Sequence, residues 1–116
     1  MASSPAYTYL IKEITKFVDG DTVDVIIDLG FHISLKKRIR LYGINAPESR
    51  TRDLEEKKKG MAATKRLIEI CSANNGDLIL RCHGIGKYGR IIGEIFKEGK
   101  SVNEMMVSEG HAEKYE

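Results

Sequence analysis

The chain contains few of the features that mark secreted, disulfide-bonded or membrane proteins. Its only two cysteines, Cys71 and Cys82, are too few for a disulfide framework and form no Cys-x-x-Cys pair. Both lie in apolar patterns, so we expect buried free thiols. No apolar run approaches the length of a membrane span, and residues 1–5 lack the basic segment and apolar stretch of a signal peptide. We therefore expect no membrane partner and see no export signal in this chain.

The sequence also lacks the short motifs of several large enzyme classes. It contains no P-loop, no nucleophile elbow and no Rossmann glycine fingerprint. Its histidines, His32, His83 and His111, are isolated and lack the spacing of a metal-binding helix. There are no internal repeats and no linker. With 116 residues, of which 41% are apolar and 31% charged, we expect one globular domain spanning residues 1–116, and a monomer.

Positive charge gathers in two segments, although the formal net charge is only +2. One segment is residues 36–40 and the other is residues 50–59. A basic patch steers a nucleic acid even on a near-neutral protein, because the local potential governs the encounter. For the run Lys57, Lys58 and Lys59 we favour a simpler interpretation, a solvated helix face.

Alternating patterns predict five strands. The first three are residues 9–18, 22–29 and 32–42, and the last two are residues 77–82 and 91–96. The third segment is expected to turn one set of side chains inward and the other outward: Ile33, Leu35, Ile39 and Leu41 inward, and Ser34, Lys36, Arg38 and Arg40 outward. Short turns between the first three strands favour an antiparallel meander.

Two helices complete the expected fold. The first covers residues 57–72 and is expected to end at Asn74-Asn75-Gly76. Its apolar stripe is predicted to consist of Met61, Thr64, Leu67, Ile68 and Cys71. The second is short and begins at a capping box, in which Ser101 caps the helix and Glu104 follows three residues on. This order predicts an α+β protein, a five-stranded Greek-key barrel of the OB type with two helices.

Carboxylates stand at two places where the chain turns. Asp19 and Asp21 surround a glycine and are able to direct oxygens to one point, as Ca²⁺ requires, but Asp-Gly is also common in plain turns. Glu48 follows Pro47 in a polar loop, where it is either a general base or an ordinary exposed glutamate. The residues alone leave both alternatives open.

Two arginines and a tyrosine supply groups that suit a nucleic acid. Arg40 ends a strand on its polar face, and Arg90 follows Lys87-Tyr88-Gly89. A guanidinium is a permanently charged fork that fits phosphate oxygens, although a lone arginine is more often a surface ion-pair partner. Tyr88 is either a stacking platform for a base or a half-buried strand aromatic.

The order of four segments resembles the staphylococcal-nuclease-like (thermonuclease) family over residues 9–112. The segments are Asp19-Gly20-Asp21-Thr22, Arg40, Asn45-Ala46-Pro47-Glu48 and Lys87-Tyr88-Gly89-Arg90. The resemblance implies the same barrel and a calcium-dependent nuclease that acts on accessible DNA and RNA strands with little sequence preference and leaves 3′-phosphate ends.

The resemblance also implies a role for each matching residue. Asp21 is expected to bind Ca²⁺ with Asn45 and the backbone carbonyl of Ala46, and Asp19 to support them. Arg40 and Arg90 are expected to clamp the scissile phosphate, and Glu48 to orient or deprotonate the attacking water. The expected substrate-binding residues are Lys87, Tyr88 and Tyr115.

The chain departs from the family pattern at the metal site. Asn45 stands where the family has a ligating aspartate, so the donor is an uncharged carbonyl oxygen and calcium affinity is expected to fall. Ala46 replaces a threonine whose contribution is a backbone carbonyl. The family's carboxy-terminal helix is expected to be absent beyond Glu116. The alternative to an active nuclease is a catalytically weakened barrel that binds nucleic acid or protein, and we favour the nuclease because Asp21, Arg40, Glu48 and Arg90 all remain.

Overall fold

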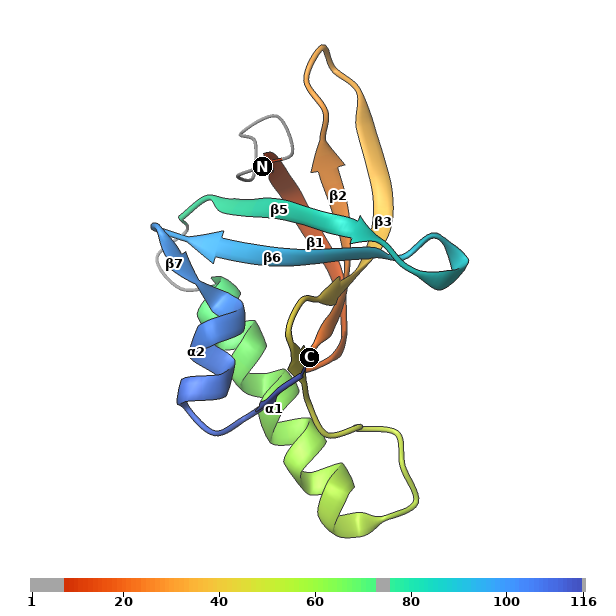
Figure 1. The fold of residues 1–116 in the computed structure, drawn as a ribbon, viewed down its shortest axis with the longest axis vertical. Helices are drawn as coiled ribbons and strands as arrows, with labels where there is room; N and C mark the ends of the chain where they lie inside the picture. The colour runs from red at the N-terminus through yellow and green to blue at the C-terminus, as the bar shows by residue number, and fades with distance from the viewer. Residues whose placement is uncertain (1–7, 73–75, 116) are drawn as a thin grey trace.

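The structure is a computed structural model, and it describes residues 8–72 and 76–115. Five long strands form a closed mixed barrel: β1 (Thr8–Asp19), β2 (Thr22–Asp28), β3 (Ser34–Leu41), β5 (Leu78–Ile85) and β6 (Ile91–Lys97). Their order is β3-β2-β1-β5-β6, and a parallel pairing of β3 with β6 closes the barrel. The predicted α+β barrel is therefore confirmed (Figure 1).

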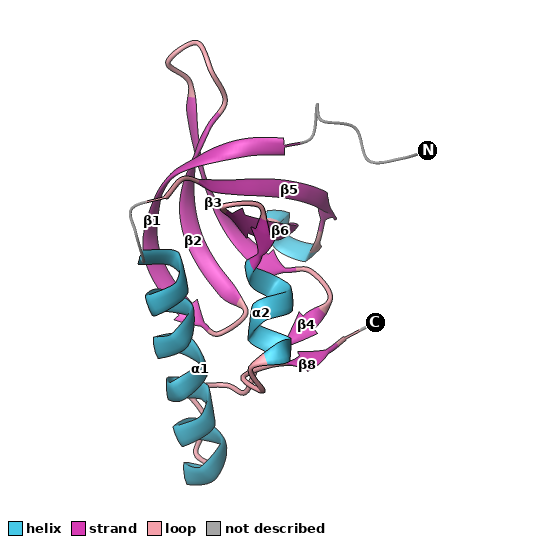
Figure 2. Cartoon of the chain, turned by 90° about the vertical axis from the view of Figure 1, so that its left-hand side faces the viewer, coloured by secondary structure: helices cyan, strands magenta, loops and turns pink. Residues whose placement is uncertain are grey.

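The remaining elements cover one end of the barrel. Helix α1 (Leu54–Ser72) precedes β5, and α2 (Val102–Ser108) follows β6 and the short strand β7 (Lys100–Ser101). Two further short strands, β4 (Ile44–Asn45) and β8 (Glu113–Lys114), pair antiparallel. Figures 1 and 2 show both helices at the same end, opposite the projecting β2–β3 hairpin. None of the described helices is long and apolar enough to cross a membrane.

The core lies inside the barrel because the strands alternate as the sequence predicts. Val23 and Val25 from β2 and Ile39 and Leu41 from β3 are almost fully buried. They pack with side chains from β5, β6 and the two helices, of which the largest are Leu67, Leu80, Ile95 and Met106. Removing these apolar surfaces from water is the main force that closes the barrel.

Two residues that were predicted to face inward do not: one lies just before β3 and the other lies within it. Ile33 is 55% exposed and Leu35 is 38% exposed. The cause is the length of the β2–β3 hairpin, whose outer end extends past the neighbouring strands and leaves these two side chains largely uncovered (Figure 2). At its tip, Phe31 and His32 both have positive φ and form the centre of a turn that the Ile33 amide closes on the Gly30 carbonyl.

Helix α1 begins three residues earlier than predicted. Asp53 caps it, since its Oδ1 accepts hydrogen bonds from the amides of Glu55 and Glu56. The predicted apolar stripe was partly wrong: Met61 is 57% exposed and Ile68 is 40% exposed. The buried side is made of Gly60, Ala63, Leu67, Ile70 and Cys71, because small residues let the helix approach the barrel closely. The predicted stop at Asn74 and Asn75 lies outside the described residues.

Helix α2 follows its capping signals. The Ser101 hydroxyl accepts a hydrogen bond from the Glu104 amide, as the capping box predicts. Asn103, in the first turn, is 2% exposed. Its Nδ2 donates to the carbonyls of Tyr42 and Gly93, and its Oδ1 accepts from the Ile95 amide. One side chain thus ties α2 to β6 and to the end of β3.

Candidate functional site

The Arg40 side chain is the centre of the candidate site. Its Nη1 lies 3.4 Å from Asp21 Oδ2, and its Nη2 donates to Asn45 Oδ1 at 3.3 Å. Nη1 also donates to the Leu41 carbonyl at 3.1 Å. Arg40 thus contacts two of the predicted metal ligands directly, although they lie 19 and 5 positions away in the sequence. A guanidinium held in this way is fixed in orientation, which favours binding of a phosphate at its remaining donors.

The Asp21 side chain links the turn between β1 and β2 to the segment after β4. Its Oδ2 accepts a hydrogen bond from the Ala46 amide at 2.8 Å, and its Oδ1 accepts one from Thr22 Oγ1 at 2.9 Å. The residue is only 7% exposed. A buried carboxylate needs such partners, because its desolvation is otherwise costly. The predicted ligands Asp21, Asn45 and Ala46 therefore form one connected group with Arg40.

Asp19 has a different contact from the one that we expected. Its Oδ1 accepts hydrogen bonds from the Ser49 hydroxyl at 2.6 Å and from the Ser49 amide at 3.2 Å. Ser49 follows Glu48 directly. Asp19 thus holds the loop that carries the predicted general base, and its predicted support of a metal ion stays a prediction.

Close packing against α1 fixes the same loop from the other side. A Cβ atom on Gly60 would lie 2.4 Å from the carbonyl carbon and oxygen of Glu48 and 2.6 Å from the Ser49 amide nitrogen. Only glycine permits this approach of the helix to the loop backbone. On Gly20, similarly, a Cβ would lie 2.7 Å from the Ala63 Cβ. The two glycines let α1 hold the β1–β2 turn and the Glu48 loop together.

Glu48 is exposed and lines a cavity of about 910 Å³ between its loop, the start of α1 and the segment after α2. Asn45 and Ala46 line the same cavity, as do five acidic or basic side chains beyond the loop: Asp53, Glu55, Glu56, Lys59 and Glu113. Neither Arg40 nor Arg90 is among its lining residues. The cavity therefore gives solvent access to Glu48.

Arg90 lies immediately before the strand pair that closes the barrel. The next residue, Ile91, pairs with Ile39 of β3, and Ile92 pairs with Arg40. The two predicted phosphate-binding arginines thus lie at neighbouring parallel strands, Arg40 within β3 and Arg90 just before β6. Arg90 Nε is buried and has no hydrogen-bond partner within the described part of the chain. An unpaired buried donor on a cation is costly, and this atom is enclosed by the protein.

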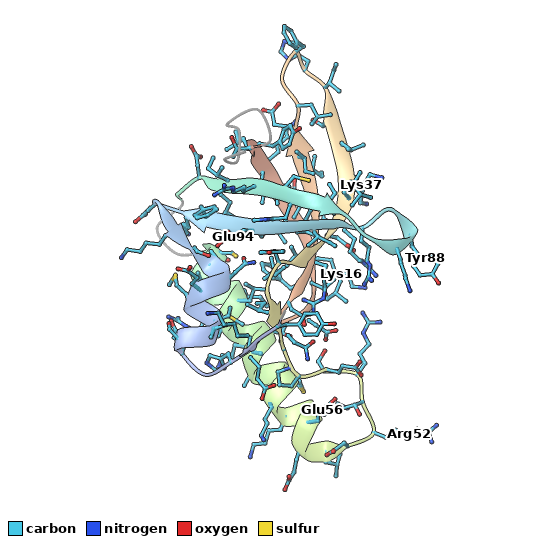
Figure 3. All side chains as sticks on the ribbon, viewed as in Figure 1. Lys16, Lys37, Arg52, Glu56, Tyr88 and Glu94 are labelled. Carbon is cyan, nitrogen blue, oxygen red and sulfur yellow. The ribbon has the colours of Figure 1, made fainter. Side chains whose placement is uncertain are left out.

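The predicted substrate-binding residues lie at two separate places. Lys87 and Tyr88 form a short 3₁₀ turn between β5 and β6, where Tyr88 has a φ of 62° and is 97% exposed. Figure 3 shows its side chain at the outer end of this loop. Tyr115 is 61% exposed, and its amide donates to the Gly43 carbonyl just before β4. The half-buried alternative for Tyr88 is therefore wrong.

The donor set suits a hard cation but supplies little charge. Asp21, Asn45 and Ala46 offer only oxygen atoms, as Ca²⁺ prefers. Of these, only Asp21 is charged, and its oxygens already contact Arg40, the Ala46 amide and Thr22. No group of three or more His, Cys, Asp or Glu side chains able to hold a metal ion occurs in residues 8–72 and 76–115. These residues fit a weak calcium site that depends on oxygens from substrate and water.

Cysteine chemistry plays no part in this site. Both cysteines are free, and Cys71 is buried in the core as predicted, whereas Cys82 is half-buried. Burial raises the pKa of the Cys71 thiol to about 11, despite the opposing influence of Lys97. The thiol is therefore protonated at neutral pH and is a poor nucleophile.

Sequence reasoning missed the residues that hold the site together. Ser49, Gly60 and Asn103 make no recognisable motif, and their importance comes from contacts between distant segments. A weak signal existed for Gly60, since a glycine inside a helical pattern costs about 1 kcal/mol relative to alanine and usually has a packing reason.

Comparison with known proteins agrees with the fold. Residues 38–116 match the family described as Staphylococcal nuclease homologue. Protein ParB of Escherichia coli is 27% identical over 130 residues, which cover 99% of this chain and 63% of that protein. Endonuclease YncB of Bacillus subtilis (strain 168) is 30% identical over 102 residues, covering 85% and 45%. Micrococcal nuclease of Shigella flexneri is 27% identical over 124 residues, covering 99% and 64%. The chain thus spans between 45% and 64% of the length of these relatives.

Proposed function

We propose that this chain, which belongs to the staphylococcal nuclease family, hydrolyses phosphodiester bonds of DNA and RNA with calcium as cofactor. The observation that carries the proposal is the contact of Arg40 with both Asp21 and Asn45, beside a loop that presents an exposed Glu48. Two relatives are named as nucleases, which supports the same reaction class.

Arg40 and Arg90 bind the scissile phosphate in this proposal. As water adds to phosphorus, negative charge grows on the phosphoryl oxygens, and fixed guanidinium donors stabilise it, commonly by several kcal/mol. The contacts of Arg40 with Asp21 and Asn45 keep its fork in place before substrate arrives. Support for the role of Arg90 comes from its place one residue before Ile91, which pairs with Ile39 next to Arg40.

Glu48 positions the attacking water and accepts its proton. The water oxygen forms a bond to phosphorus, the bond from phosphorus to the 5′ oxygen breaks, and that oxygen takes a proton from solvent. The products are a 3′-phosphate and a 5′-hydroxyl. Asp19, through Ser49, and Gly60, through close packing, hold the backbone from which Glu48 projects. A correctly placed base of this kind contributes about 10²- to 10⁴-fold to the rate.

Asp21, Asn45 and the Ala46 carbonyl are the residues that would hold Ca²⁺, and the ion would polarise a phosphate oxygen. Because Asn45 brings no charge, we expect half-maximal activity only at a high, millimolar calcium concentration. Lys87 and Tyr88 bind the strand near Arg90, and Tyr115 offers a second stacking surface. No base-reading element is proposed, so sequence preference is weak.

The second candidate function is a barrel that binds nucleic acid without cutting it. The observation in its favour is that the predicted metal ligands carry only one negative charge, that of Asp21. In the described residues, Asp21 is also the only carboxylate that contacts Arg40. Binding through Arg40, Arg90 and Lys87 needs no metal ion, so this function would survive a lost calcium site.

Digestion of heat-denatured DNA, with millimolar calcium or with a chelator, separates the two candidates. The proposal expects fragments with 3′-phosphate ends in calcium and intact DNA in chelator. Intact DNA under both conditions, together with retarded migration of the DNA in a gel, would reject the nuclease and favour the binding barrel.

A further inference from the structure

Strand β3 carries a row of cations that leads to the candidate site. The pairing of β3 with β2 sets Lys36 opposite Ile26, Arg38 opposite Asp24 and Arg40 opposite Thr22. Residues two apart on a strand point to the same face, so Lys36, Arg38 and Arg40 form one outward-facing row. Their spacing is about 6.7 Å, twice the rise per residue of a strand, which is close to the distance between successive phosphates of an extended chain.

The row lies along a free edge of the sheet. β3 pairs with β6 only through residues 39–41, so residues 34–38 have no strand beside them on that side within the described chain. Lys36 and Arg38 are exposed there. An extended polymer can lie along this edge without displacing any part of the protein that the structure describes.

An exposed aromatic ring stands beside the same edge. Lys37 points to the opposite face of β3 from Arg38, and its Nζ lies 3.8 Å from the position of a Cβ on Gly89. Tyr88, the residue before Gly89, is 97% exposed. Figure 3 shows Lys37 and Tyr88 on the same side of the molecule. Lys36 and Arg38 thus flank the edge on one face of β3, and Lys37 and the loop of Tyr88 flank it on the other. Cations beside an exposed ring are the two elements of a single-strand binding surface.

One carboxylate holds the row in place and does not cancel it. Asp24 accepts two hydrogen bonds from Arg38, one from Nε at 2.7 Å and one from Nη2 at 3.2 Å. The hydrogen bond from Arg38, with weaker attraction from Lys16 and Lys36, holds the pKa of Asp24 below its usual value. Of the row, Arg38 is paired with Asp24 and Arg40 with Asp21. Arg38 keeps unused donors while its orientation is fixed.

We propose that the free edge of β3, with Lys36, Lys37, Arg38 and Tyr88, is a track for single-stranded nucleic acid that delivers the strand to Arg40. The inference rests on the proposed function and deepens it by naming the form of the substrate and its path. A single strand suits the track because an unpaired base can stack on Tyr88, whereas the bases of a duplex are paired and stacked on one another.

The test measures binding without cleavage. A fluorescent oligothymidylate is titrated in chelator into a Glu48→Gln parent, and the dissociation constant is followed between about 50 and 200 mM salt. The track variant adds Lys36→Gln, Lys37→Gln and Arg38→Gln. Its slope of log affinity against log salt should be shallower by about 2, since each lost single-strand phosphate contact removes about 0.7.

Two further variants keep the result interpretable. Lys57→Gln/Lys58→Gln/Lys65→Gln removes the same charge from exposed positions on α1 and should leave the slope unchanged. If loss of the Arg38–Asp24 pair unfolds the triple variant, the Lys36→Gln/Lys37→Gln pair should still lower the slope by about 1.4. Equal changes in the track and α1 variants would overturn the track, because net charge alone would then explain the binding.

Other outcomes also decide the matter. No salt-dependent binding by the parent, or the same loss of affinity for a duplex of equal length, overturns the proposal of a single-strand track. The proposed function is judged separately, because these titrations contain no calcium and no Glu48 carboxylate. If Lys36→Gln, Lys37→Gln and Arg38→Gln are introduced into the wild-type chain and denatured DNA is still cut at the wild-type rate in calcium, the track is rejected and the nuclease is left in place.

Discussion

At the scale of single residues, Asn45 is the departure from the family pattern from which we expect the largest effect on the chemistry. Its Oδ1 is occupied by Arg40 Nη2 at 3.3 Å, in the position where the family has a charged ligand. An amide oxygen keeps the hydrogen bond to Arg40 but adds no negative charge toward a cation. We therefore expect this side chain to set how well a metal ion competes with Arg40 for the Asp21 carboxylate.

Restoring a carboxylate should strengthen the metal site. We expect Asn45→Asp to lower the calcium concentration for half-maximal cleavage by about tenfold, equivalent to about 1.4 kcal/mol. The same change should increase the calcium-induced rise in melting temperature, a readout that does not depend on activity. Asn45→Ala, which offers no oxygen, is the matched control. Identical calcium dependence in wild type and Asn45→Asp would contradict a ligand role for this position.

Gly60 is predicted to be essential for the position of Glu48. In Gly60→Ala, the new Cβ meets backbone atoms of Glu48 and Ser49 at 2.4–2.6 Å, so the loop must move. Overpacking of this kind costs about 1–3 kcal/mol, more than the helix propensity of alanine returns. The melting temperature and the cleavage rate should both fall. Lys65→Ala, which adds an alanine at an exposed position of α1 outside the lining of the cavity, is the control. Activity lost equally in both variants would count against the contact.

At the scale of elements, the sequence was informative wherever a local rule operates. Strand alternation placed Val23, Val25, Ile39 and Leu41 in the core, and the capping box at Ser101 formed as predicted. Prediction failed where neighbours decide. The buried face of α1 includes Gly60 and Ala63 because the helix packs closely against the barrel there. Ile33 is exposed because the β2–β3 hairpin extends past the neighbouring strands. Neither fact has a local signal.

The junction of α2 with the barrel should be sensitive to Asn103. Asn103→Ala removes the side-chain partner of the Tyr42 carbonyl and of the Ile95 amide, whereas the Gly93 carbonyl still accepts from the Tyr42 amide. Each buried polar group left without a partner costs about 1–3 kcal/mol. We therefore expect the free energy of unfolding, measured with denaturant, to fall by about 3 kcal/mol. Ser108→Ala, at an exposed position of the same helix, should change stability by less than about 0.5 kcal/mol. Similar losses in both variants would refute the junction.

At the scale of the whole molecule, closure of the barrel assembles the site. The turn after β1 brings Asp21, the end of β3 brings Arg40, and the parallel pairing of β3 with β6 brings Arg90 beside it. The sequence named these residues through the family resemblance, in the right order. It gave no access to Ser49, Gly60 or Asn103, which act between segments far apart in the chain. Motifs identify reacting groups, whereas the groups that position them depend on packing.

The most direct test of the account compares cleavage rates of wild type and Glu48→Gln. End-labelled, heat-denatured DNA is digested in millimolar calcium, and the unfolding of both proteins is recorded in parallel. Because Glu48 is exposed, the variant should unfold like wild type, while its cleavage rate falls by about 10²-fold or more. Equal rates for the two proteins, or no cleavage by wild type, would contradict the assignment of this site as a nuclease centre.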